Sequence, residues 1–126
     1  MGENKGYITM EDVGGSINIS EEVIGIIAVE AIGQVEGVAS VSNTLGNDIA
    51  ELFGKKTPMK GVTVDKDGDK LVINAHITVS YGYTINTVAE NVQAAVIEAI
   101  DSMTGIKVSA VNVHVNAISF RKEENA

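Results

Sequence analysis

The sequence predicts an α+β fold: a two-layer sandwich whose mixed, mostly antiparallel sheet carries two main helices on one face. Alternating apolar and polar residues mark several strands, while two other segments place apolar residues at helical spacing. The 126 residues are enough for one domain, and 44% of them are hydrophobic, mainly Val and Ile. With only 4% aromatic residues and no Trp, the core is expected to be aliphatic.

We expect three parts along the chain. Residues 1–14 are polar and contain glycine without periodicity, which predicts a flexible N-terminal arm. Residues 15–120 hold every strand and helix signal and form a single α+β domain. Residues 121–126 form a charged C-terminal tail.

The first helix is expected from residue 21 to about 34, after a short alternating strand at 16–19. Ser20 is a suitable N-cap, and Glu21 and Glu22 face the positive end of the helix dipole. The apolar residues of this helix cover more than one face: Val23, Ile24, Ile26, Ile27, Ala28, Val29, Ala31 and Ile32. Such a helix is buried on two sides, one against the sheet and the other against the second helix or another subunit.

The middle of the chain predicts three strands. Gly37 ends the first helix unit, and residues 38–42 then form a strand. Residues 43–60 are the least regular part, with a short helix at 48–53. Strands at 62–64 and 71–81 form a hairpin around Asp67-Gly68. Alternation along the longer strand predicts one buried sheet face and one mostly polar face.

The second helix, at about 86–103, has the clearest pattern in the chain. Its apolar residues recur at helical spacing: Val88, Ala89, Val92, Ala95, Val96, Ala99, Ile100 and Met103. Thr104-Gly105 ends it. A last strand at about 107–120 is expected to point Val111, Val113, Val115 and Ala117 inward.

The only two histidines, His76 and His114, lie on the polar sides of two predicted strands. If those strands are neighbours, six side chains form one polar surface: Asn74, His76, Thr78, Asn112, His114 and Asn116. One interpretation is an ordinary solvent-facing side of a sheet, and the other is an interaction face. A metal site would need a third ligand, and no carboxylate alternates with these residues, so none is predicted.

Two further motifs fail at identifiable positions. The acidic run that begins at Asp65 would need Gly and Glu where a calcium loop has its sixth and twelfth residues, but Lys70 and His76 stand there. Gly54-Lys55 lacks the distant Gly and the following hydroxyl of a phosphate loop, because Ile49 and Lys56 occupy those positions. No nucleophile with a matching base is identifiable, so we expect no catalytic residues, no cofactor and no enzyme activity.

The charge of the chain restricts its partners. A net charge of −8 disfavours nucleic acid and unassisted adsorption to an anionic membrane. The chain has no Cys, no secretory signal and no apolar run of the roughly 18 residues that a membrane span needs. We therefore expect a cytoplasmic protein with no direct membrane insertion.

Several segments in order resemble the alkaline-shock, or Gls-type, envelope stress response family of mainly Gram-positive bacteria. The resemblance covers residues 15–120. The matching segments are Gly15-Ser16-Ile17-Asn18-Ile19-Ser20, Gly37-Val38, Lys60-Gly61-Val62, Tyr81-Gly82, Ile85, Val92-Gln93, Met103-Thr104-Gly105-Ile106 and Val111-Asn112-Val113-His114-Val115. It implies a small two-layer α/β protein without catalytic residues. It further implies a stress-associated cytosolic protein that self-associates and, in some members, is held near the membrane by a transmembrane partner.

The leading hypothesis is a non-enzymatic envelope or alkaline stress response protein that forms a homo-oligomer and binds a membrane-anchored partner at the inner face of the cell membrane. The binding surface would be the first helix, a strand edge or the polar surface around His76 and His114. Two alternatives stay open: a regulatory subunit that binds a metabolic enzyme, and an RNA-binding module. The acidic charge speaks against the RNA-binding module.

Overall fold

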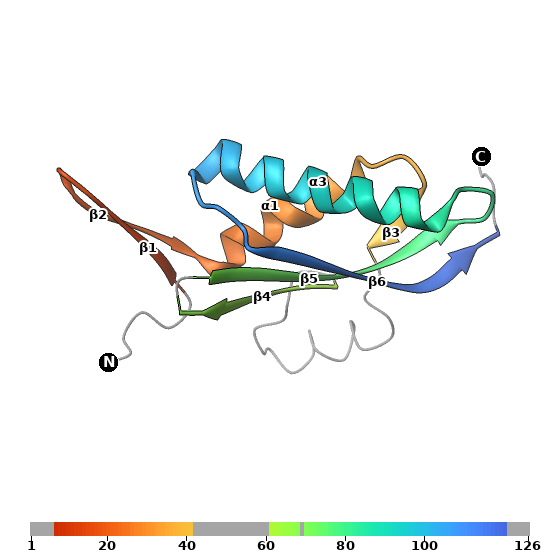
Figure 1. The fold of residues 1–126 in the computed structure, drawn as a ribbon, viewed down its shortest axis with the longest axis horizontal. Helices are drawn as coiled ribbons and strands as arrows, with labels where there is room; N and C mark the ends of the chain where they lie inside the picture. The colour runs from red at the N-terminus through yellow and green to blue at the C-terminus, as the bar shows by residue number, and fades with distance from the viewer. Residues whose placement is uncertain (1–6, 42–60, 69, 121–126) are drawn as a thin grey trace.

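The computed structural model describes residues 7–41, 61–68 and 70–120. Both long helices lie side by side on one face of the main sheet, and a separate hairpin projects from one end of the domain (Figure 1). The α+β prediction and its two-layer arrangement are therefore confirmed. The elements are β1 (Tyr7–Asp12), β2 (Gly15–Ser20), α1 (Glu21–Gly33), β3 (Val38–Val41), β4 (Val62–Asp67), β5 (Lys70–Ser80), α3 (Ile85–Thr104) and β6 (Ala110–Ser119).

The main sheet is organised around β5. Strand β4 pairs antiparallel with the first half of β5, and β3 pairs antiparallel with its second half. Strand β6 pairs with β5 in parallel over nearly its whole length. Because β6 occupies one side of β5, both β3 and β4 lie on the other side, one after the other along the length of β5. Strands β1 and β2 form their own two-stranded antiparallel sheet.

The core lies between the upper face of β5 and the two helices. Every second residue of β5 is buried, which confirms the alternation predicted for this strand. The buried set is Leu71, Ile73, Ala75, Ile77 and Val79 from β5, Ile24, Ile27, Ala28 and Ile32 from α1, and Val88, Val92, Val96 and Ile100 from α3. Each such aliphatic side chain contributes about 1.5–3 kcal/mol by leaving water, so this layer holds the helices on the sheet.

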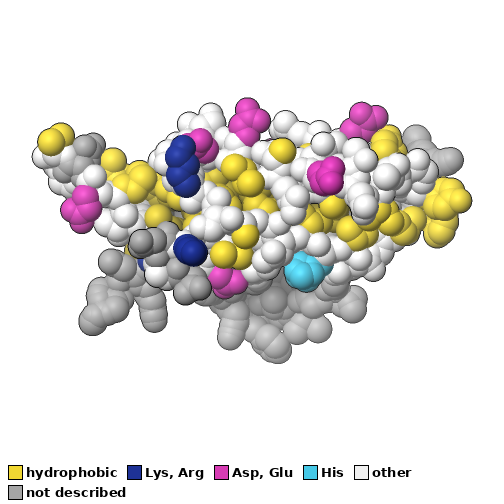
Figure 2. Space-filling view, viewed as in Figure 1, with side chains coloured by type: hydrophobic (Ala, Val, Ile, Leu, Met, Phe, Trp, Pro, Cys, Tyr) yellow, Lys and Arg dark blue, Asp and Glu magenta, His cyan; other side chains and the backbone are white. Residues whose placement is uncertain are grey.

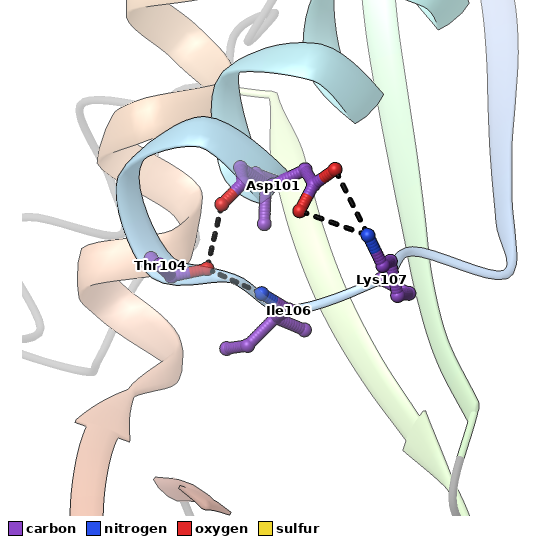
Figure 3. Close-up of polar contacts among 5 residues, drawn as sticks. Asp101, Thr104, Ile106 and Lys107 are labelled. Carbon is purple, nitrogen blue, oxygen red and sulfur yellow. Dashed lines mark hydrogen bonds and ion pairs between the residues drawn. The ribbon is translucent and has the colours of Figure 1, made fainter.

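Side chains define the start of α1 and the end of α3. The Ser20 hydroxyl accepts a hydrogen bond from the Val23 amide at 3.1 Å, as expected of an N-cap. At the end of α3, Thr104 Oγ1 donates to the Ile100 carbonyl at 2.6 Å and accepts from the Ile106 amide at 3.0 Å (Figure 3). Gly105 is left-handed at φ 81°, and Lys107 Nζ contacts the Asp101 carboxylate at 3.1 Å. The Met103–Ile106 segment of the family resemblance is thus a helix stop.

The structure differs from the sequence predictions in two places. Residues 7–12 form β1, where we expected a flexible arm, and they pair with β2 in regular register. Ala117 is exposed, where we expected it inward, because the β5–β6 register shifts by one residue after Ile77. Ile118 packs against the core instead. The predicted helix at 48–53 and the whole loop at 43–60 lie outside the described residues.

Gly37, between α1 and β3, packs directly on the base of α3. Its φ is +98°, and a Cβ there would lie 2.7 Å from Val88 Cγ2 and 3.0 Å from Tyr83 Cδ2. Its carbonyl accepts the Ser80 amide at 2.8 Å, which holds the backbone against the end of β5. Both the left-handed conformation and the close approach therefore require glycine.

We predict that Gly37→Ala destabilises the domain more than Gly82→Ala. Gly82 has nearly the same backbone angle, φ +104°, but no described atom lies within 4 Å of its would-be Cβ. Both substitutions incur backbone strain of about 1–2 kcal/mol, and Gly37→Ala adds overpacking of about 1–3 kcal/mol. Urea unfolding followed by circular dichroism measures both. Equal losses in the two variants would contradict the packing role of Gly37.

Candidate interaction surfaces

The sheet face opposite the helices carries the six polar residues that the sequence singled out, here called the polar face: Asn74, His76, Thr78, Asn112, His114 and Asn116. The parallel register of β5 and β6 places Asn74 opposite Asn112 and His76 opposite His114. The two imidazole rings are stacked, with centroids 4.6 Å apart and planes 17° from parallel. The structure thus brings the two histidines together. Thr78 lies beyond the bulge, opposite Ala117.

Hydrogen bonds connect the polar face across three strands. Asn112 Nδ2 donates to Asn74 Oδ1 at 3.0 Å, and Asn74 Nδ2 donates to Asp65 Oδ2 at 2.9 Å. On the other side of the histidine stack, Asn116 Nδ2 lies 3.2 Å from His76 Nδ1. Sequence reasoning missed Asp65 as a member of this row. The available signal was the alternation of polar residues along the β4 hairpin strand.

The polar face presents amide and imidazole groups that can form hydrogen bonds with a partner. Asp65 is the only carboxylate in the described row, and its contact to Asn74 leaves it at the periphery. Among the residues that the structure describes, no three His, Cys, Asp or Glu side chains gather into a metal-binding group. Amides and stacked imidazoles can donate to and accept from a partner's polar groups, which fits a recognition surface.

Strand β6 forms a free edge of the main sheet. One side pairs with β5, and no described strand pairs with the other. Natural proteins usually protect such edges with charged residues, Pro or bulges. The ten residues of β6 include no charge and no Pro, and the single bulge follows Val115. One carbonyl of this strand is already occupied, because Val111 O accepts a hydrogen bond from Gln93 Nε2 of α3 at 3.0 Å. The stretch Asn112–Val115 is therefore a regular strand edge that no described strand or side chain of α3 covers by a hydrogen bond.

Apolar side chains accompany this edge. Val113 and Val115 are only partly buried under α3, and Ile97 on the same helix is 39% exposed. At the far end, the rings of Tyr81 and Phe120 pack 5.1 Å apart although each residue is 71% exposed. Figure 2 shows hydrophobic side chains in a broken band between the helical layer and β6, continuing to an exposed cluster at the end of the domain. An exposed apolar band beside a strand edge is typical of an association surface.

Comparisons with known proteins identify the family of the chain. Residues 9–120 match the alkaline shock protein 23 family, described as having a cell envelope-related function. The chain belongs to this family. The resemblance read from the sequence is thereby confirmed, and the function of the family is cell envelope-related. No helix among the described residues is long and apolar enough to cross a membrane.

Two sequence relatives are described as uncharacterized, and one solved structure has a similar but distant fold. The uncharacterized protein YqhY of Bacillus subtilis is 34% identical over 106 residues, covering 84% of this chain and 78% of that protein. An uncharacterized protein of Streptococcus pyogenes serotype M6 is 35% identical over 109 residues, covering 86% and 82%. Among solved structures, the copper form of the MamM CTD is 18% identical with a TM-score of 0.47, covering 83% of this chain and 90% of that one.

We predict that the stacked histidines contribute modestly to stability and couple to each other. A cross-strand pair of this kind is worth about 0.2–1 kcal/mol. His76→Ala, His114→Ala and the double variant form a double-mutant cycle, measured by urea unfolding at one fixed pH. A coupling free energy of zero within error would mean that the stack is a passive consequence of the strand register.

Proposed function

We propose that this protein is a non-enzymatic envelope or alkaline stress response protein that assembles with itself and binds a membrane-anchored partner at the cytoplasmic face. Strand β6 carries the proposal, because it is a regular, uncharged, unpaired edge bordered by exposed apolar side chains. The family's cell envelope-related function supports the cellular setting. No residue cluster in the described chain suggests a reaction, which favours binding over catalysis.

The geometry favours a symmetric dimer in which the β6 strands of two copies pair. A twofold contact uses the same patch on both copies and closes at two subunits. Antiparallel pairing over Asn112–Val115, beyond the Val111 carbonyl that Gln93 occupies, would extend the four-stranded sheet across both copies and cover Val113 and Val115. Because β6 has no charged residue, this contact brings no like charges of that strand together.

We predict that the protein self-associates and that Val113→Lys abolishes this. A lysine at an edge position, pointing toward the helical layer, can reach water in the monomer but is buried when another strand pairs. Val64→Lys is the matched control, since Val64 is also a partly buried valine and lies on β4, across β5 from β6. Sedimentation velocity over a concentration series gives the oligomeric state, and circular dichroism checks that both variants fold.

A wild-type protein that stays monomeric up to high micromolar concentration would contradict self-assembly. If Val64→Lys and Val113→Lys disrupt assembly equally, the β6 strands of two copies do not pair with each other. The copies would then join head to tail, with β4 of one copy against β6 of the next.

We further predict that the purified protein does not bind vesicles of phosphatidylglycerol without a partner. Its net charge of −8 repels anionic lipid, so recruitment to the membrane must depend on another protein. Vesicle co-sedimentation at low salt, where surface electrostatics are strongest, is the direct measurement. If the protein binds these vesicles in the absence of any other protein, no anchored partner is needed for recruitment.

A further inference from the structure

The outer face of the helical layer contains a groove between α1 and α3, here called the helical groove. It has a volume of about 500 Å³ and runs between the second half of α1 and the second half of α3. Its lining is Ile26, Ile27, Glu30, Ala31, Gln34, Val35, Ala95, Glu98, Ala99, Ser102 and Met103. The walls from Ile26 to Gln34 and from Ala95 to Met103 are each about 12 Å long at helical rise.

The groove has an apolar floor of small residues and an exposed apolar rim. Ala31, Ala95 and Ala99 leave room for another backbone to approach closely. Ile26 is 46% exposed and Met103 is 71% exposed, one from each helix. The surplus apolar surface that the sequence predicted for the first helix is therefore real, and part of it stays open in this groove.

The electrostatics of this layer are one-sided. Helix α1 carries Glu21, Glu22 and Glu30, helix α3 carries Glu90, Glu98 and Asp101, and neither helix contains a Lys or Arg. Lys107 compensates Asp101 at the end of α3. Within the groove, Glu30 on one wall and Glu98 on the other are exposed carboxylates. No Lys or Arg among the residues that the structure describes lines the groove beside them.

We propose that the helical groove binds an amphipathic helix that carries Lys or Arg beside its apolar face, supplied by a partner protein. This inference rests on the proposed function and names the chemistry by which the partner is recognised. The apolar face of such a helix would cover Ile26, Met103 and the alanine floor. Its cations would meet Glu30 and Glu98.

Other occupants fit the groove less well. A strand needs free backbone partners, and the backbone groups of both walls are used inside the helices. A second copy placed symmetrically would oppose carboxylates with carboxylates, and neither α1 nor α3 of another copy can supply a cation. An anionic lipid surface is repelled by the same charges.

Fluorescence anisotropy with a labelled 18-residue Leu/Lys peptide tests the proposal. The peptide places leucines at i, i+3, i+4 and i+7 and lysines elsewhere. One control peptide has the same composition in shuffled order, so it keeps the charge and loses the apolar face. In a second control peptide Glu replaces every Lys. We expect binding only of the amphipathic Lys peptide, weakened by added salt.

Charge-reversal variants in the groove test whether the peptide binds there. Glu30→Lys with Glu98→Lys should weaken peptide binding about tenfold, because two attractive contacts become repulsive. Glu98→Lys alone is compared with Glu90→Lys, which lies on the same helix outside the groove and changes the net charge by the same amount. Glu90→Lys should change binding less than about twofold. Equal effects of Glu98→Lys and Glu90→Lys, or equal binding of the shuffled peptide, would overturn the groove assignment.

The same variants separate this proposal from self-assembly. Sedimentation of Glu30→Lys with Glu98→Lys should match the wild type, because β6 lies outside the groove. A change in oligomeric state would mean that a second copy occupies the groove, which overturns the proposal. If the peptide does not bind but the wild-type protein still assembles, the groove proposal is wrong and the proposed function is unaffected.

Discussion

The whole domain depends on the two-residue period of β5. Five alternate residues of this strand are buried beneath the helices, and the residues between them face the other side of the sheet. A slip of one residue would move Asn74 and His76 into the aliphatic core and expose Ile73 and Ile77. Burying such polar groups without partners is costly, so the register of β5 is fixed. That register in turn positions β3 and β4 on one side and β6 on the other.

The polar face follows from this constraint rather than from any local preference of its residues. Because β6 pairs with β5 in parallel, His114 lies opposite His76 and Asn112 lies opposite Asn74. The rows of hydrogen bonds and the imidazole stack are thus consequences of one strand pairing. The sequence placed these six residues on one face of the sheet because alternation alone selects the face of a strand. It could not establish the adjacency of β5 and β6, since the strand order depends on how α3 crosses the sheet.

The errors in the sequence-based interpretation also arise where the structure depends on a neighbouring strand. Ile8 and Met10 alternate with Thr9 and Glu11, which is a strand signal, but the segment is short and its partner β2 was read as a strand on its own. Ala117 continues a perfect alternation in the sequence, yet a bulge reverses the pattern there. A bulge depends on the twist and length of the neighbouring strand, which no local pattern encodes. Helix ends were predicted well because Ser20 and Gly105 act within a single turn.

The three surfaces differ in direction as well as in chemistry. The helical groove opens on the outside of the helical layer, the polar face lies on the opposite side of the sheet, and the β6 edge lies between them. Pairing of two copies at β6 would leave both faces of each copy accessible. Such a dimer would present two helical grooves, so a partner with two basic helices, or a partner that is itself concentrated in a membrane, would bind with avidity. Weak contacts at each groove would then suffice, which is consistent with a short groove whose charges are exposed to solvent. In this proposal, self-assembly and partner binding would support each other because they use different surfaces.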